Sequence, residues 1–264
     1  MDLNADMGEW SGAELPETER ELLHYVTTAH VACGAHAGGR DSMHRTVAAA
    51  VAAGVVVGAH PAYPDREHFG RAPMALDAQE VAALVLDQVA TLSEVARAEG
   101  TTVRSVKPHG ALYHRLATDE ETAEVVADAI GRIGRDLVMV VPANSETGDA
   151  FHAAGIATVA EGFCDRAYRP DGSLVSRAEP GALLTIPADA ASQALTIALD
   201  GRARAVDGST VQVRCESLCV HGDTPGAPAI ARRVREVLEA HGVGIASFVG
   251  AAGAVDGGQP GSPA

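Results

Sequence analysis

Short apolar runs alternate with longer amphipathic stretches along most of the chain. Strands are predicted at the apolar runs, which cover residues 2–6, 30–36, 54–60, 102–109, 136–142, 156–163 and 217–223. Helices are predicted at the Ala-rich stretches between them, at residues 40–53, 77–99, 119–131, 189–200 and 226–240. Acidic residues near the start of several stretches support this assignment, because negative charge stabilises a helix N-terminus.

Strands that alternate with helices indicate βα units and a parallel sheet. About seven such units predict a single (β/α) barrel, closed or nearly closed, with an open doubly wound sheet as the alternative. No linker rich in Pro, Ser and Gly interrupts the pattern, so we expect one catalytic barrel domain over residues 1–249. Residues 250–264 are small and low in complexity, which predicts a disordered C-terminal tail.

Charge and composition exclude several classes of protein. Lys and Arg number 20 and Asp and Glu 35, which gives a net charge of −15. This balance argues against binding to nucleic acid or to an anionic membrane surface. The first residues, MDLNADMGEW, contain no leader-like apolar segment, and no apolar run reaches the roughly 18 residues that cross a bilayer. We therefore expect a cytoplasmic protein.

The four cysteines form no CxxC pair and are expected to be free thiols.

The 20 basic residues include a single lysine, Lys107. Every other basic position is occupied by Arg. We therefore predict that position 107 needs a compact ammonium, which can release a proton where a guanidinium cannot. Aromatic residues are scarce, at 3% of the chain, and six of the nine lie in or beside the predicted strand ends. They are predicted to line a pocket: Trp10, Tyr63, Phe69, Tyr113, Phe163 and Tyr168.

Ionisable residues recur where the predicted strands end. They are Asp6 with Glu9 beyond it, His36, His60, Lys107, His109, Glu161, Asp165, His221 and Asp223, with Asn144 near the end of the fifth run. In a parallel barrel the carboxyl ends of all strands share one rim, which is where active sites form. These side chains are therefore predicted to converge in one pocket.

Two chemistries fit Asp6, His36, His60 and His109. One is a divalent metal held by a carboxylate and two imidazoles, which would activate water. The other is metal-free acid–base catalysis by Lys107 and a neutral imidazole. Spacing along the chain leaves both open, so the presence of a metal is undecided. A Walker A loop is absent, because Val-Arg-Ser-Val precedes the only lysine, and so is a GxSxG nucleophile elbow.

Six segments together resemble the LamB/YcsF family over nearly the whole chain. They are DLNADMGE (2–9), ACGAHAGG (32–39), GAHPAYPDREHFGR (58–71), VKPHGALYH (106–114), EGFCDRAYRPDGSLVSR (161–177) and LCVHGDTPGA (218–227). The resemblance implies a barrel like that of the glycoside hydrolase/deacetylase group. It implies hydrolysis of the cyclic amide 5-oxo-L-proline (pyroglutamate) to L-glutamate, coupled to ATP hydrolysis and carried out with B and C subunits. Departures from the family pattern at Ala35, Arg40, His68 and Ala72 bear on pocket shape and substrate preference.

This reaction assigns roles to the rim residues. A lysine or a neutral imidazole would take the lactam N–H proton, and the predicted catalytic set is Asp6, His36, His60, Lys107 and His109. A bidentate arginine suits the substrate carboxylate, and the predicted substrate-binding set is Tyr63, Arg66, Arg71, Asp165, Arg166, Arg177, His221 and Asp223. Two other functions stay open: a stand-alone metal-dependent deacetylase or amidohydrolase for a small amide or sugar, and a non-catalytic subunit that binds the lactam.

Overall fold

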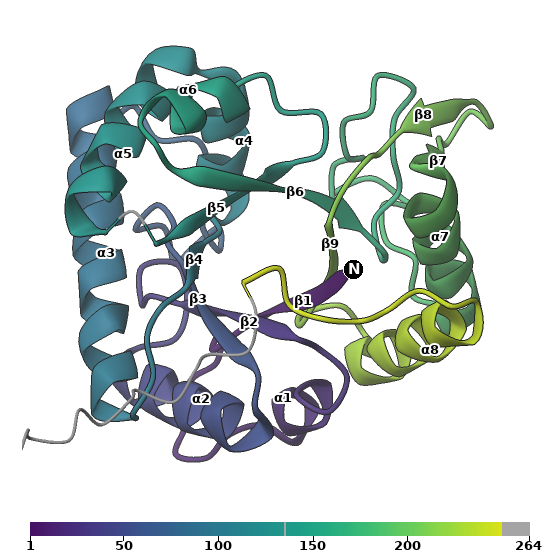
Figure 1. Ribbon diagram of the computed structural model, residues 1–264, viewed down its shortest axis with the longest axis horizontal. Coiled ribbons are helices and arrows are strands. Elements are labelled where there is room, and N and C mark those ends of the chain that lie inside the picture. The colour runs from purple at the N-terminus through teal and green to yellow at the C-terminus, as the bar shows by residue number, and fades with distance from the viewer. Residues whose placement is uncertain (135, 250–264) are drawn as a thin grey trace, which may run out of the picture.

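Seven parallel strands close into a barrel in the order β1–β2–β3–β4–β5–β6–β9 (Figure 1). This is seen in a computed structural model that describes residues 1–134 and 136–249. The strands are β1 (Asp2–Met7), β2 (Thr28–Ala32), β3 (Val56–His60), β4 (Ser105–Val106), β5 (Val138–Pro142), β6 (Ala157–Phe163) and β9 (Ser217–His221). Closure comes from β9, which pairs with β6 on one side and β1 on the other. The predicted barrel is confirmed, and the open-sheet alternative is wrong because both would-be edges are paired.

Eight helices surround the strands in the described part of the chain (Figure 1). They are α1 (Glu17–Leu22), α2 (Arg40–Ala53), α3 (Ala78–Ala98), α4 (Gly110–Thr118), α5 (Glu120–Ile133), α6 (Gly148–Ala153), α7 (Pro187–Asp200) and α8 (Ala227–Ala240). The five predicted helices are α2, α3, α5, α7 and α8, each within two residues at either end. The sequence pattern missed α1, α4 and α6, because helices of six to nine residues are shorter than the window of about 11–18 residues in which helical periodicity can be recognised.

Local sequence explains where the long helices begin. The Asp77 carboxylate accepts from the Glu80 backbone N–H at 2.8 Å, and the Glu80 side chain accepts from the Asp77 N–H at 2.8 Å. This capping box satisfies two N–H groups that α3 leaves unpaired.

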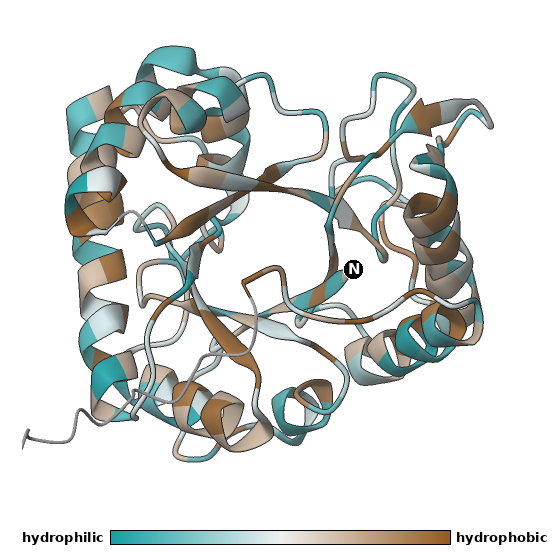
Figure 2. Ribbon diagram, in the orientation of Figure 1, coloured by the Kyte–Doolittle hydropathy of each residue, from teal (hydrophilic) through white to brown (hydrophobic). Residues whose placement is uncertain are grey.

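The buried face of α5 carries Ala123, Val126, Ala127 and Ile130, at the spacing of one helical stripe. Figure 2 shows hydrophobic colour along the strands and patches of hydrophilic colour on the surrounding helices.

Two strand predictions need correction. The run 30–36 is predicted to be strand throughout, but β2 ends at Ala32 and His36 lies four residues beyond it in a loop. The run 102–109 contains only the two-residue strand β4, and Pro108 beyond it has no N–H to donate to a ladder. An antiparallel hairpin of β7 (Arg202–Arg204) and β8 (Thr210–Gln212), which the sequence pattern missed, lies outside the barrel.

The segment after α8 passes beside the amino-terminal end of the barrel. The Met1 ammonium donates to the Gly244 carbonyl at 2.8 Å, and the Ala246 N–H donates to the Met1 carbonyl at 3.0 Å. The Thr28 and Ser247 hydroxyls lie 3.2 Å apart. The tail predicted at 250–264 lies outside the described residues. None of the described helices has the length and apolar character needed to span a bilayer.

Candidate active site

A cavity of about 480 Å³ lies at the carboxyl ends of the barrel strands. Five of its lining residues come from the ends of three strands and the segment after β4: Asp6, His60, Lys107, His109 and His221. Four arginines, together with Tyr113 and Phe163, line much of the remaining wall. Five of the predicted strand-end groups therefore meet at one rim, whereas the others do not line the cavity.

Lys107 occupies the centre of the site and is 2% exposed. Its Nζ lies 2.8 Å from Asp6 Oδ1 and 2.8 Å from Glu161 Oε1. It also donates to Asn4 Oδ1 and Cys219 Sγ, each at 3.1 Å. Because these contacts use all three N–H donors, the side chain is a fixed internal cation held by two carboxylates.

This environment sets the charge states of the pair. Burial alone would lower the pKa of Lys107, but the Asp6 and Glu161 charges raise the pKa well above its usual value. Burial alone would raise the pKa of Asp6, but the neighbouring His60 and Lys107 hold it well below its usual range. A proton-releasing Lys107 is therefore disfavoured, and the ammonium keeps Asp6 ionised.

The inside of the barrel is polar, and the sequence of β1 indicates this. In β1 the residues Asp2, Asn4 and Asp6 alternate with the apolar residues of DLNADM, so they share one face of the strand. The Asn4 amide donates to Glu161 Oε1 at 2.9 Å and to the Ser217 hydroxyl at 2.8 Å. Glu161 Oε2 accepts from the Tyr113 hydroxyl at 2.8 Å. Glu161 and Tyr113 are predicted to lie at the rim, but the predicted catalytic and substrate-binding sets include neither of them.

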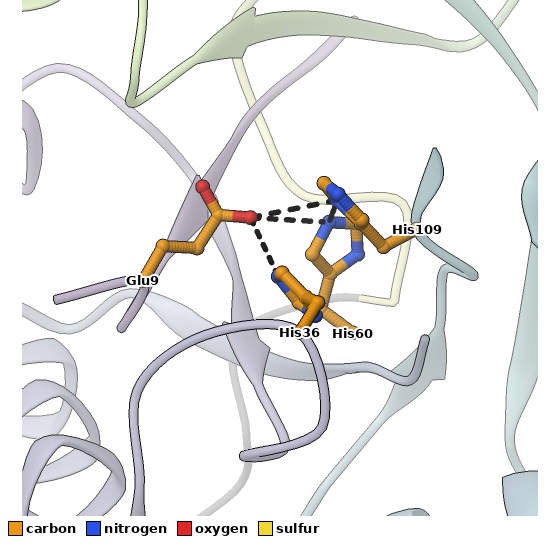
Figure 3. A group of neighbouring side chains, drawn as sticks. All are labelled: Glu9, His36, His60 and His109. Carbon is orange, nitrogen blue, oxygen red and sulfur yellow. Dashed lines mark hydrogen bonds and ion pairs between the residues drawn. The ribbon is translucent and has the colours of Figure 1, made fainter. Parts of the chain in front are cut away.

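Three histidines and Glu9 form a second group beside Lys107 (Figure 3). Glu9 Oε1 lies 2.9 Å from His36 Nε2, 3.4 Å from His109 Nδ1 and 3.9 Å from His60 Nε2. Burial and the Asp6 charge raise the pKa of Glu9 to about 7. Burial lowers the pKa of His36 to about 4, and burial with the neighbouring histidines lowers that of His109 well below its usual value. Glu9 lies beyond β1 in a loop; it is predicted to lie at the rim but is in neither the predicted catalytic nor the predicted substrate-binding set.

The loop before Arg71 is shaped to meet this group. Phe69 is the non-glycine residue of the described chain with positive φ, at 57°, and its carbonyl lies 2.9 Å from His109 Nε2. Gly70 follows at φ 67°, and a Cβ there would lie 2.9 Å from the Cβ of His36. Such strained backbone persists where surrounding structure fixes it and is common at functional sites.

Asp165 and His221 form a dyad, of which His221 lines the cavity and neighbours Asp6 on the adjacent strand β1. His221 Nδ1 lies 2.8 Å from Asp165 Oδ1, and Asp165 is fully buried. The backbone N–H of His221 and the Thr224 hydroxyl also donate to Asp165, at 3.1 and 2.5 Å. Burial alone would raise the pKa of Asp165, but these groups lower it. The ionised carboxylate holds the proton of His221 on Nδ1, which leaves Nε2 free to accept a proton.

The four predicted arginines occupy different environments. Arg66 donates to the carbonyls of Gly34 and Gly38 at 2.7 and 2.6 Å and is absent from the cavity lining, so it braces the loop that carries His36. Arg71 and Arg177 line the cavity, and both pair with Asp223, at 2.6 and 3.0 Å.

Arg166 is different because it is buried and lines the cavity. Its Nη2 donates to the Val175 carbonyl at 2.6 Å, and its Nε has no partner among the described residues. Burial and the nearby Arg177 lower its pKa to about 10. Gln193 fixes the start of this loop by donating to the carbonyls of Phe163 and Arg166, each at 2.8 Å.

The remaining predicted residues lie near the cavity without lining it. Tyr63 is 1% exposed and packs in the core, while His36, Asp165 and Asp223 act on residues that do line it. Of the six aromatic residues, Tyr113 and Phe163 line the cavity, and Phe163 stacks on His221 with ring centroids 5.5 Å apart. All four cysteines are free thiols, as expected.

Comparisons with known proteins agree over almost the full length. A 5-oxoprolinase A subunit of Agrobacterium fabrum is 47% identical over 248 residues, which cover 94% of this chain and 97% of that protein. The 5-oxoprolinase A subunit of Methylococcus capsulatus is 46% identical over 95% of this chain and 96% of that protein.

Solved structures support the same fold. The crystal structure of a "Lactam Utilization Protein" from Thermus thermophilus aligns with a TM-score of 0.85 and 43% identity over 94% of this chain and 99% of that one. A solved structure from Enterococcus faecalis, 12% identical, aligns with a TM-score of 0.54 over 94% of this chain and 96% of that one, which shows a shared fold alone. The family model described as "LamB/YcsF family" matches residues 1–253. The chain belongs to the LamB/YcsF family.

Proposed function

We propose that this chain is the A subunit of an ATP-dependent 5-oxoprolinase, which hydrolyses 5-oxo-L-proline to L-glutamate together with B and C subunits. The observation that carries the proposal is the 47% identity, over 94% of the chain, to a protein named as that subunit. The cavity supports it, since its volume of about 480 Å³ suits a small molecule. Its wall offers a cation for a carboxylate and a base for an amide proton.

Arg166 binds the substrate carboxylate. The Arg71 and Arg177 side chains already pair with Asp223, whereas the Arg166 Nε has no partner among the described residues. A guanidinium can bind a carboxylate through two parallel hydrogen bonds. A buried cation that faces the cavity therefore both attracts the carboxylate and fixes the orientation of the ring.

His221 takes the lactam N–H proton at Nε2. Asp165 holds the imidazole in the required tautomer and stabilises the imidazolium that results. Loss of that proton concentrates negative charge on the amide oxygen, which then attacks the γ-phosphorus of ATP and releases ADP. The phosphorylated imidate is a far better acceptor for water than the resonance-stabilised lactam. Ring opening and phosphate release together consume two waters and yield glutamate and phosphate.

The Lys107–Asp6–Glu161 group keeps the floor of the cavity charged and rigid. Lys107 does not move a proton, because its ammonium is held by two carboxylates at 2.8 Å. Asp6 stays ionised and lines the cavity, where it accepts a hydrogen bond from attacking water. The sequence contains no Walker A loop, so we assign ATP binding to the assembled complex.

The test is reconstitution. We expect the purified A, B and C subunits together to release glutamate from 5-oxo-L-proline in step with ADP formation, and to release none when this chain is omitted. Glutamate release by B and C without this chain would contradict the proposal, as would a complex that forms ADP but no glutamate. Full turnover by His221→Gln in the complex would instead support a non-catalytic, lactam-binding role.

A further inference from the structure

The tautomers of two neighbouring histidines are fixed by backbone carbonyls. His60 Nδ1 lies 2.7 Å from the Lys107 carbonyl oxygen, and His109 Nε2 lies 2.9 Å from the Phe69 carbonyl oxygen. A carbonyl oxygen can only accept, so each of these nitrogens must carry the ring proton. The remaining nitrogens, His60 Nε2 and His109 Nδ1, are therefore unprotonated in the neutral rings.

These two unprotonated nitrogens face each other at 3.0 Å. Two lone pairs at that distance repel unless a cation lies between or beside them. A third donor is close, since Glu9 Oε1 lies 3.4 Å from His109 Nδ1 and 3.9 Å from His60 Nε2 (Figure 3). His60 and His109 line the cavity, which provides a route of entry.

His36 does not complete this group as a fourth equal ligand. Its ring stacks on that of His109 with centroids 4.0 Å apart and planes 5° apart. One ion cannot lie in the planes of two parallel stacked rings, so both lone pairs cannot point to it. His36 Nε2 instead lies 2.9 Å from Glu9 Oε1, where its N–H orients the carboxylate. Such an outer hydrogen bond positions a ligand without touching the metal.

We propose that His60 Nε2, His109 Nδ1 and the Glu9 carboxylate form a binding site for one divalent transition metal of the Zn²⁺ type, with His36 as a positioning residue. Two imidazoles and one carboxylate are a donor set that such ions favour. With Zn–N bonds of about 2.0–2.1 Å, two nitrogens 3.0 Å apart subtend close to a right angle at the metal. Metal binding requires the Glu9 carboxylate, now 3.4 and 3.9 Å from the two nitrogens, to move toward them. The metal site does not depend on the lactam reaction, because none of the contacts that define it involves the substrate.

Metal binding is tested on the full-length chain after dialysis against a chelator. We expect calorimetric titration to give one Zn²⁺ per chain, and Co²⁺ to produce a visible absorption band of matching stoichiometry. His60→Gln and His109→Gln are each expected to weaken Zn²⁺ binding at least 100-fold. His36→Gln should weaken it about 10- to 100-fold while the Co²⁺ band keeps its shape. His44→Gln is the matched control, since His44 pairs with Glu99 on the outer surface and should not affect binding.

Wild-type protein provides a second measurement that does not rely on the folding of variants. X-ray absorption at the zinc edge of the loaded chain is expected to count two imidazole ligands. Three imidazoles, or none, would overturn the proposed ligand set. Failure of wild-type protein to take up Zn²⁺ at millimolar concentration would mean that a shared proton separates His60 from His109, and the metal site would be wrong. Glutamate release by the reconstituted complex is scored separately, so either proposal can fail alone.

Discussion

Replacing Lys107 by Met removes the cation between two buried carboxylates. Asp6 and Glu161 are 4% and 1% exposed, and each lies 2.8 Å from Lys107 Nζ. Methionine has a similar length and keeps most of the packing, so the loss is chiefly electrostatic. Removing one partner of a buried ion pair typically costs about 3–5 kcal/mol, because the other charge stays buried. For a chain of this size, at about 2–4 °C per kcal/mol, the Tm should fall by roughly 6–20 °C.

The loss of stability in Lys107→Met should depend on pH. In the wild type the pKa of Asp6 is lowered, so its stabilising contribution is present above its ordinary pKa and is lost as pH falls through the folded-state value. The pKa of Lys107 is raised, so its contribution persists throughout the neutral range and is lost only when pH rises through the folded-state value. In Lys107→Met the pKa of Asp6 rises, because the ammonium that lowers it is gone, and protonation of Asp6 relieves the repulsion. The Tm difference between wild type and variant should therefore narrow from pH 8 to pH 5.

Thermal unfolding followed by circular dichroism measures both effects. Arg40→Met is the matched control, because Arg40 pairs with Glu94 at 3.4 Å with both side chains more than half exposed. Exposed pairs of this kind contribute about 0–1 kcal/mol. A Lys107→Met variant no less stable than Arg40→Met at pH 7, or an equal deficit at pH 5 and pH 8, would refute the account of Lys107 as a fixed internal cation.

Four further outcomes are expected. Lys107→Arg should reduce glutamate formation by the complex more than tenfold, because the planar guanidinium does not fit between two carboxylates that hold an ammonium at 2.8 Å; retention of most activity would show that charge alone suffices. His221→Gln should lower kcat about 10²–10⁴-fold with a small change in KM, and an unchanged kcat would remove the dyad from the chemistry. Arg166→Met should raise KM for 5-oxo-L-proline about 10- to 100-fold, as expected for loss of a charged hydrogen bond of about 1.5–3 kcal/mol, whereas the exposed Arg233→Met should leave KM unchanged. The isolated chain should form no ADP in response to the lactam, and robust ADP formation by it would contradict the assignment of ATP to the complex.

The order and spacing of the apolar runs are enough to predict the barrel and its functional rim. Apolar runs separated by amphipathic stretches specify βα units, and the carboxyl ends of such strands must meet at one end. Strand-end positions therefore placed Asp6, His60 and His221 around one cavity without any structural information. The alternation in DLNADM also encodes a polar barrel interior, since side chains two residues apart share a face of a strand.

Which of these groups are in contact depends on how the barrel closes and how its loops pack. Barrel closure brings Glu161 to Lys107 across 54 positions of sequence, and this contact turns a candidate proton carrier into a fixed cation. Glu9 and His36 reach the histidine group from loops, whose paths no periodic pattern specifies. Asp223 pairs with two of the predicted arginines, whereas Arg166 lines the cavity without an ion-pair partner among the described residues. Periodicity fixes the face on which a side chain lies, whereas ion pairs and histidine tautomers depend on separations of a few ångströms that arise when distant segments pack together.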